Sequence, residues 1–245
     1  DRVREPVLSF RPTPQPGEQE RDVIGPSQIT LGQWSPDSHY VLLWLGPLSA
    51  SIMADGNEPW VLDVETGEIL AIVDYPDFDP NRYQKYDSKK WTPYAITSEF
   101  EPGSCFKLVI LATVLNSPNR GQLLKDYYDV SKGYIIISGK KIKDTHKAKI
   151  INFPEIFIHS SNIGVSLLSQ KLEALNFYLT ARKLGFTFQT GVELPAEANG
   201  YMDSPRKIRK ALRFANNAFG QGLRVNFLQL AVAYLAVANN GKLLK

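Results

Sequence analysis

Glu101-Pro102-Gly103-Ser104-Cys105-Phe106-Lys107 begins an apolar run that extends to Leu115. The Pro-Gly pair interrupts any preceding element, so the pattern predicts a helix over Phe106–Leu115 that starts directly after it. Ser104 and Lys107 are three residues apart and share one face of such a helix. The stretch therefore places a hydroxyl and an amine side by side near a helix N-terminus.

A serine and a lysine placed in this way can support nucleophilic catalysis. The backbone dipole at a helix N-terminus favours a developing anion, and a desolvated lysine can be neutral and accept the serine proton. The alternative is an N-capping Ser104 beside a solvated Lys107. The spacing alone favours this alternative, because Ser-x-x-Lys occurs by chance in most proteins. Cys105 is interpreted as a small buried residue, since no histidine can be placed beside it.

A second polar motif, His159-Ser160-Ser161-Asn162-Ile163-Gly164, precedes a predicted helix over Ile163–Leu172. By itself it predicts a helix N-cap. Taken with Ser-x-x-Lys, however, Ser160 and Asn162 supply the second of three elements that mark penicillin-binding proteins and class A β-lactamases. The third element, Lys-Thr-Gly, does not occur in the sequence.

Residues from about Trp60 to Lys245 resemble the transpeptidase domain of class B penicillin-binding proteins. The similar segments follow one another in the family's order, over about 185 of the 245 residues: Val61–Ala71, Tyr75–Asn81, Phe100–Lys107, Ser160–Gly164, Leu184–Phe186, Thr190–Pro195, Phe219–Gly222 and Gln229–Ala231. The family usually has threonine where this chain has Cys105. The resemblance implies an α+β fold of the penicillin-binding-protein/β-lactamase type, with helices packed on a central antiparallel sheet.

The resemblance also implies an activity. A peptidoglycan D,D-transpeptidase cross-links stem peptides ending in D-Ala-D-Ala through a serine acyl-enzyme, and β-lactam antibiotics acylate the same serine. Ser104 would be the nucleophile, Lys107 its general base, and Ser160 the proton relay to the leaving amine. Asn162 and the Gly220-Gln221-Gly222 turn would bind substrate. No metal or cofactor is expected.

The same resemblance implies work in cell division or cell shape, at the extracytoplasmic face of the bacterial membrane and alongside cell-wall synthesis partners. Because Lys-Thr-Gly is absent, we expect the last active-site strands to be missing and catalysis to be impaired. The resemblance implies an oxyanion hole formed by the backbone N–H of Ser104 and one N–H of these strands. Loss of one such donor lowers the reaction rate by a factor on the order of 10²–10³. Two alternatives stay open: a non-catalytic or sensor-type penicillin-binding remnant, and a serine β-lactamase.

Composition suggests two parts. Seven of the 16 prolines lie in residues 1–50. We interpret residues 1–50 as an atypical N-terminal segment, with a proline-rich linker and a hairpin like part of a propeller blade, and residues 51–245 as a partial transpeptidase domain.

Further predicted elements are a hairpin over Trp60–Val73, a strand–turn–strand over Tyr134–Ile142, and helices over Ala174–Leu184 and Val225–Ala238.

Charge and residue counts exclude several classes of protein. The net charge of +3 is too small to indicate a nucleic-acid-binding surface. A single cysteine excludes an internal disulfide framework, and the three histidines show no metal-binding spacing. No apolar run reaches the roughly 18 residues of a membrane span. The basic runs Lys140–Lys149 and Arg206–Arg213 are predicted to be solvated faces.

Overall fold

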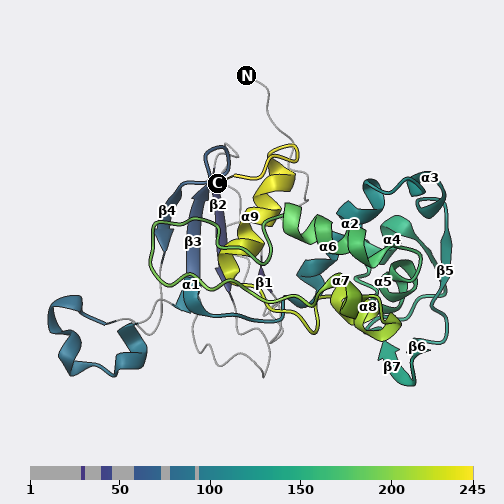
Figure 1. Cartoon of the computed structure of the whole chain (residues 1–245), viewed down its shortest axis with the longest axis horizontal. Helices are drawn as coiled ribbons and strands as arrows, with labels where there is room; N and C mark the ends of the chain where they lie inside the picture. The colour runs from purple at the N-terminus through teal and green to yellow at the C-terminus, as the bar shows by residue number, and fades with distance from the viewer. Residues whose placement is uncertain (1–28, 31–39, 46–57, 73–77, 92–93, 245) are drawn as a thin grey trace, which may run out of the picture. The chain divides into compact units, whose positions relative to one another are not determined.

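The computed structural model describes residues 29–30, 40–45, 58–72, 78–91 and 94–244. These residues form two compact units, drawn in Figure 1. The first unit takes its residues from Asp1–Ser98, Thr190–Ala198 and Asn226–Lys245, and the second from Glu99–Gln189 and Asn199–Val225.

The first unit contains a four-stranded antiparallel sheet in the order β1-β2-β3-β4 (Figure 1). Its strands are β1 (Ile29–Thr30), β2 (Tyr40–Leu45), β3 (Glu58–Asp63) and β4 (Ile69–Ile72). The turn between β3 and β4 is closed by the Asp63 carboxylate, which accepts hydrogen bonds from the backbone N–H groups of Glu65 and Thr66. The predicted hairpin over Trp60–Val73 is therefore confirmed for its described residues.

Helices accompany this sheet in the first unit: α1 (Tyr94–Thr97) and α9 (Phe227–Ala238), with 3-10 turns over Pro80–Lys85 and Ser88–Trp91. Asn226 caps α9 through a reciprocal capping box with Gln229. The backbone N–H of Gln229 donates to Asn226 Oδ1 at 2.7 Å, and the backbone N–H of Asn226 donates to Gln229 Oε1 at 3.0 Å. At the other end of the helix, the Asn239 side chain donates to the Val64 carbonyl beyond β3. The predicted C-terminal helix is confirmed, and it begins after its cap at Asn226.

The predicted N-terminal segment, residues 1–50, is described only at β1 and β2, and both strands pair within the sheet. The proline-rich linker lies outside the described residues. A domain boundary near residue 50 stays a prediction.

The second unit is mainly helical. Its elements are a 3-10 turn, η3 (Gly103–Phe106), and α2 (Lys107–Leu115), α3 (Arg120–Leu123), α4 (Phe153–Ile158), α5 (Asn162–Ser169), α6 (Ala174–Lys183), α7 (Pro205–Ile208) and α8 (Ala211–Ala218). Phe106, Phe177 and Phe186 are almost completely buried and, with Phe214, form a connected aromatic cluster with ring centroids 4.8–6.1 Å apart. This cluster packs the first turn after Gly103 onto α6 and α8.

Two small antiparallel sheets complete the second unit: β5 (Tyr127–Asp129) with β8 (Ile150–Asn152), and β6 (Tyr134–Ile137) with β7 (Lys140–Lys143). Ser138 and Gly139 join β6 to β7 with φ of 48° and 77°. Two successive positive φ values are typical of the tight hairpin turn that Gly favours. The predicted strand–turn–strand is confirmed.

Within the residues that the structure describes, helices and antiparallel sheets occur together without βαβ alternation, which confirms the α+β class. Within the described residues, no helix is long and apolar enough to span a membrane.

Candidate active site

Ser104 lies at the second position of η3, where the chain turns into α2. The backbone N–H of Gly103 donates to the Gly220 carbonyl at 3.1 Å, and Gly103 has a φ of 55°. The Ser104 side chain is exposed and caps neither helix, because the N-cap of η3 is Pro102 and the N-cap of α2 is Phe106. The alternative of an N-capping Ser104 is therefore wrong.

Lys107 is buried, with a relative exposure of 4%, so the alternative of a solvated lysine is also wrong. Its Nζ donates to Ser104 Oγ at 3.1 Å, to Ser160 Oγ at 2.8 Å and to the Ser160 carbonyl at 2.5 Å. The three N–H bonds of the ammonium group are thus each used, and two of them end on one residue. Ser160 Oγ in turn donates to Ser104 Oγ at 3.0 Å. The three side chains form a closed hydrogen-bonded triangle.

Ser160 reaches this triangle through an unusual backbone conformation. Its φ is 50°, which places it in the left-handed region that a non-glycine residue adopts only at a cost of about 1–2 kcal/mol. The residue lies between α4 and α5, and this conformation turns both its hydroxyl and its carbonyl toward Lys107. The N-cap of α5 is the neighbouring Ser161, whose Oγ accepts from the Gly164 N–H at 2.8 Å. Ser160 and Asn162 therefore do not cap this helix.

The electrostatics of the triangle suit proton transfer. Burial lowers the pKa of Lys107 from 10.5 to about 8, against the opposing pull of Asp144 and Cys105. A neutral amine is therefore accessible near physiological pH. Burial raises the pKa of the Cys105 thiol to about 11, partly offset by Lys107, so this thiol stays protonated at neutral pH. The sequence predicts a small buried residue at Cys105, and the structure shows it half-buried.

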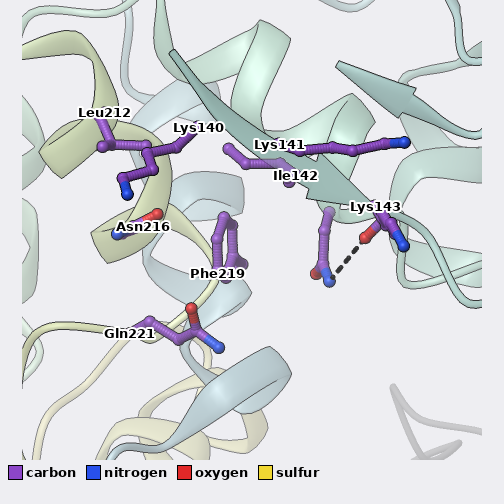
Figure 2. A pocket seen from close by; sticks show the side chains of 9 residues that line it. Lys140, Lys141, Ile142, Lys143, Leu212, Asn216, Phe219 and Gln221 are labelled. Carbon is purple, nitrogen blue, oxygen red and sulfur yellow. Dashed lines mark hydrogen bonds between the residues drawn. The ribbon is translucent and has the colours of Figure 1, made fainter. Parts of the chain in front are cut away.

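Asn162 and Gln221 line a pocket of about 420 Å³, and Ser104, Lys107 and Ser160 are not among its lining residues. The remaining lining residues come from β7, α8 and the segment after α8: Lys140, Lys141, Ile142, Lys143, Leu212, Asn216 and Phe219. Figure 2 shows Lys140 extending toward Asn216, whereas the ammonium groups of Lys141 and Lys143 point away. The lining therefore combines three apolar side chains, three side-chain amides and three lysines. The prediction that the basic run Lys140–Lys149 is a solvated face is confirmed, because all five of its lysines are exposed.

The two glycines of the predicted substrate-binding turn lie against the backbone that precedes Ser104. A Cβ on Gly220, whose φ is 79°, would overlap the Gly103 carbonyl oxygen and lie 2.6 Å from the Gly103 nitrogen. The Gly222 N–H donates to the Glu101 carboxylate at 2.9 Å. Both glycines thus position the nucleophile turn, and only Gln221 of the three faces the pocket. Substrate contact by the two glycines stays a prediction.

Sequence reasoning missed two carboxylates. Glu101 belongs to the quoted motif, but its bond to Gly222 could not be anticipated. Asp144 follows β7 and accepts from Ser161 Oγ at 2.6 Å and from the Ile163 N–H at 2.9 Å. No sequence pattern marked Asp144, because its partners lie in another element. Across the described part of the chain, no cluster of three or more His, Cys, Asp or Glu side chains could hold a metal ion.

The geometry can be compared with known proteins. Residues 60–245 match the family model described as the penicillin binding protein transpeptidase domain. This chain belongs to that family. The match begins where the predicted hairpin begins, and it includes Ser104, Lys107, Ser160 and the glycine turn.

Individual relatives give the same result. The chain is 34% identical over 184 residues to a probable peptidoglycan D,D-transpeptidase PenA of Neisseria gonorrhoeae, covering 75% of this chain and 31% of that protein. It is 34% identical to penicillin-binding protein PbpB of Mycobacterium tuberculosis, covering 74% and 26%. The chain therefore spans about a third or less of these relatives.

Solved structures resemble the fold. Penicillin-binding protein 3 of Mycobacterium tuberculosis, complexed with aztreonam, superposes with a TM-score of 0.65 at 32% identity, over 75% of this chain and 41% of that one. The transpeptidase domain of Burkholderia pseudomallei penicillin-binding protein 3 gives a TM-score of 0.66 at 25% identity, over 78% and 52%. The predicted penicillin-binding-protein type of α+β fold is confirmed.

Proposed function

We propose that this chain carries the serine acyl-transfer centre of a peptidoglycan D,D-transpeptidase. The observation that supports this most is the triangle of Ser104, Lys107 and Ser160, with Lys107 buried and its pKa lowered to about 8. A nucleophile within hydrogen-bond reach of a base of this pKa is the arrangement that acyl transfer at neutral pH requires. Membership of the family and the names of the relatives support the same reaction.

In the proposed first step, Ser104 Oγ attacks the carbonyl between the two terminal D-alanines of a stem peptide. The hydroxyl proton passes to neutral Lys107, which keeps its two remaining N–H bonds to Ser160 and turns its lone pair toward Ser104. As the tetrahedral intermediate collapses, the C–N bond breaks, Ser160 passes its hydroxyl proton to the departing D-alanine amine, and Ser160 Oγ takes the proton held by Lys107. The products are an acyl-enzyme ester and free D-alanine.

In the second step, an amine of another stem peptide attacks the ester and gives up a proton to neutral Lys107. The C–O bond of the ester then breaks, Ser104 Oγ takes this proton from Lys107, and the new C–N bond is the cross-link. Asn162, Gln221 and the amide-lined pocket would hold the peptide backbone during both steps. β-Lactams would acylate Ser104 in the same way. We place the reaction at the extracytoplasmic face of the cell membrane, where stem peptides and other cell-wall synthesis proteins are found.

The proposal is tested by incubating the chain with a fluorescent penicillin for several hours at high probe concentration, so that slow acylation is also registered. Intact mass and peptide mapping should locate one adduct on the peptide that contains Ser104, and excess ampicillin should prevent it. The adduct should persist after the free probe is removed. Rapid release would favour a β-lactamase, and no adduct at any concentration would contradict acyl transfer by this chain.

The rate of acylation is expected to rise with pH through about 8, the pKa of Lys107. Since only the neutral amine can take the Ser104 proton, the rate should fall about tenfold for each pH unit below that value. The measurement is the second-order rate constant of labelling across the pH range from roughly 6 to 10. A rate that does not depend on pH would exclude Lys107 as the base.

A further inference from the structure

Asp144 lies outside the triangle but is bonded to the residues that flank Ser160. One carboxylate oxygen accepts from Ser161 Oγ at 2.6 Å, and the other from the backbone N–H of Ile163 at 2.9 Å. Ser161 is buried, at 3% exposure, and Ile163 is completely buried. Because both ends of the carboxylate are engaged, its position relative to the first turn of α5 is fixed.

The backbone conformation of Ser160 explains why this turn has to be held in place. A serine at a φ of 50° relaxes to ordinary backbone angles unless its surroundings hold it there. On one side, the Ser160 and Ser161 N–H groups bond the carbonyls of Phe157 and Ile156. On the other side, the first turn of α5 is held through Ser161 and Ile163 by Asp144. The strained residue is therefore clamped between α4 and the chain that follows β7.

Asp144 also acts on Lys107 by charge. Two ionisable groups of the described residues act on the Lys107 ammonium, Asp144 from the end of β7 and Cys105 from η3. The Cys105 thiol has a pKa raised to about 11, so it carries no charge near neutral pH. The carboxylate of Asp144 is then the anion that favours the protonated form of Lys107 and opposes the effect of burial.

We propose that Asp144 is a positioning residue of this site. Its carboxylate holds the Ser160–Asn162 turn in the conformation that presents both Ser160 oxygens to Lys107, and its negative charge favours the protonated form of Lys107. The inference rests on the proposed acyl transfer at Ser104 for its functional meaning. The hydrogen bonds and the charge are two separate contributions, and two substitutions separate them.

Asp144→Asn removes the charge and keeps the shape. The amide oxygen can still accept from the Ile163 N–H, and the amide nitrogen can donate to Ser161 Oγ. With the anion gone, the pKa of Lys107 should fall by about one unit, and the rising part of the acylation profile should move to lower pH by the same amount.

Asp144→Glu keeps the charge but displaces the oxygens. It should leave the Lys107 titration close to that of the unsubstituted chain and slow acylation by roughly 10- to 100-fold, since small misplacements have effects of this size.

The titration of Lys107 is measured directly, by NMR of the chain with isotopically labelled lysine, and its signal is assigned by its loss in Lys107→Arg. Asp129→Asn is the matched control. Asp129 is an exposed aspartate that accepts a backbone N–H from Ser131 at 2.9 Å, and the titration of Lys107 should not change on its replacement. Backbone amide spectra of each variant show that it is folded, and Asp144→Glu provides the test if Asp144→Asn is not.

The outcomes separate the two proposals. A lowered Lys107 midpoint in Asp144→Asn, unchanged in Asp129→Asn and Asp144→Glu, supports the inference even if no penicillin adduct forms, in which case acyl transfer alone is contradicted. An unchanged midpoint in Asp144→Asn overturns the charge effect. Unchanged acylation in Asp144→Glu overturns the positioning role.

Discussion

Ser104→Ala is expected to abolish covalent labelling by a fluorescent penicillin. Ser104 Oγ is the only atom of the triangle proposed to form the ester, and alanine offers no replacement nucleophile. The substitution removes one exposed hydroxyl and its two hydrogen bonds, while Lys107 keeps both contacts to Ser160. We therefore expect the fold to survive and the adduct to be absent, as measured by intact mass and gel fluorescence.

The adjacent Cys105 supplies the control for this experiment. Cys105→Ser removes the only thiol of the chain, and labelling should persist because the protonated thiol takes no part in the proposed step. Circular dichroism and the thermal midpoint of both variants verify that they are folded. A residual adduct in Ser104→Ala that disappears in Cys105→Ser would identify the cysteine as the nucleophile and reject Ser104.

Gly220→Ala is expected to disrupt the nucleophile turn. The added Cβ would collide with the backbone of Gly103, and alanine at a φ of 79° is itself strained. Since the obstacle is backbone, a side-chain rotation cannot relieve it. We expect a loss of about 1–3 kcal/mol in the free energy of unfolding and a fall of roughly 100-fold in the acylation rate, because Ser104 moves with Gly103. Urea denaturation and labelling kinetics measure the two effects.

Gly121→Ala is the matched control for the glycine. Gly121 is exposed in α3 and has no positive φ, and a Cβ there would meet nothing within 4 Å. Alanine is favoured over glycine in a helix by up to about 1 kcal/mol, so stability should be unchanged or slightly higher and labelling should be unaffected. Equal stability and labelling in the two variants would show that Gly220 does not position Ser104.

Some of the site follows from local sequence. The Pro-Gly pair and the apolar run predicted the start of α2, and the three-residue spacing placed Ser104 beside Lys107, because helical geometry depends on neighbouring residues. The strand–turn–strand over Tyr134–Ile142 could be predicted for the same reason, because it lies within one short segment. The association of Ser160 with Ser104 could be inferred only from the family resemblance, because 56 residues separate the two serines in the sequence.

Tertiary structure decided whether these residues could act together. Burial of Lys107, which lowers its pKa, results from packing by elements distant in sequence, so the motif alone favoured a solvated lysine. The left-handed conformation of Ser160 has no sequence signal, because serine adopts it only when Asp144 and α4 hold the chain on either side. The contact of Gly220 with Gly103 likewise needs two loops folded together. The sequence by itself determined the helices α2, α5, α6 and α9 and the hairpins β3–β4 and β6–β7, because local geometry encodes them, and the family resemblance added the roles of the site residues. Only long-range packing determined the charge and orientation of the site.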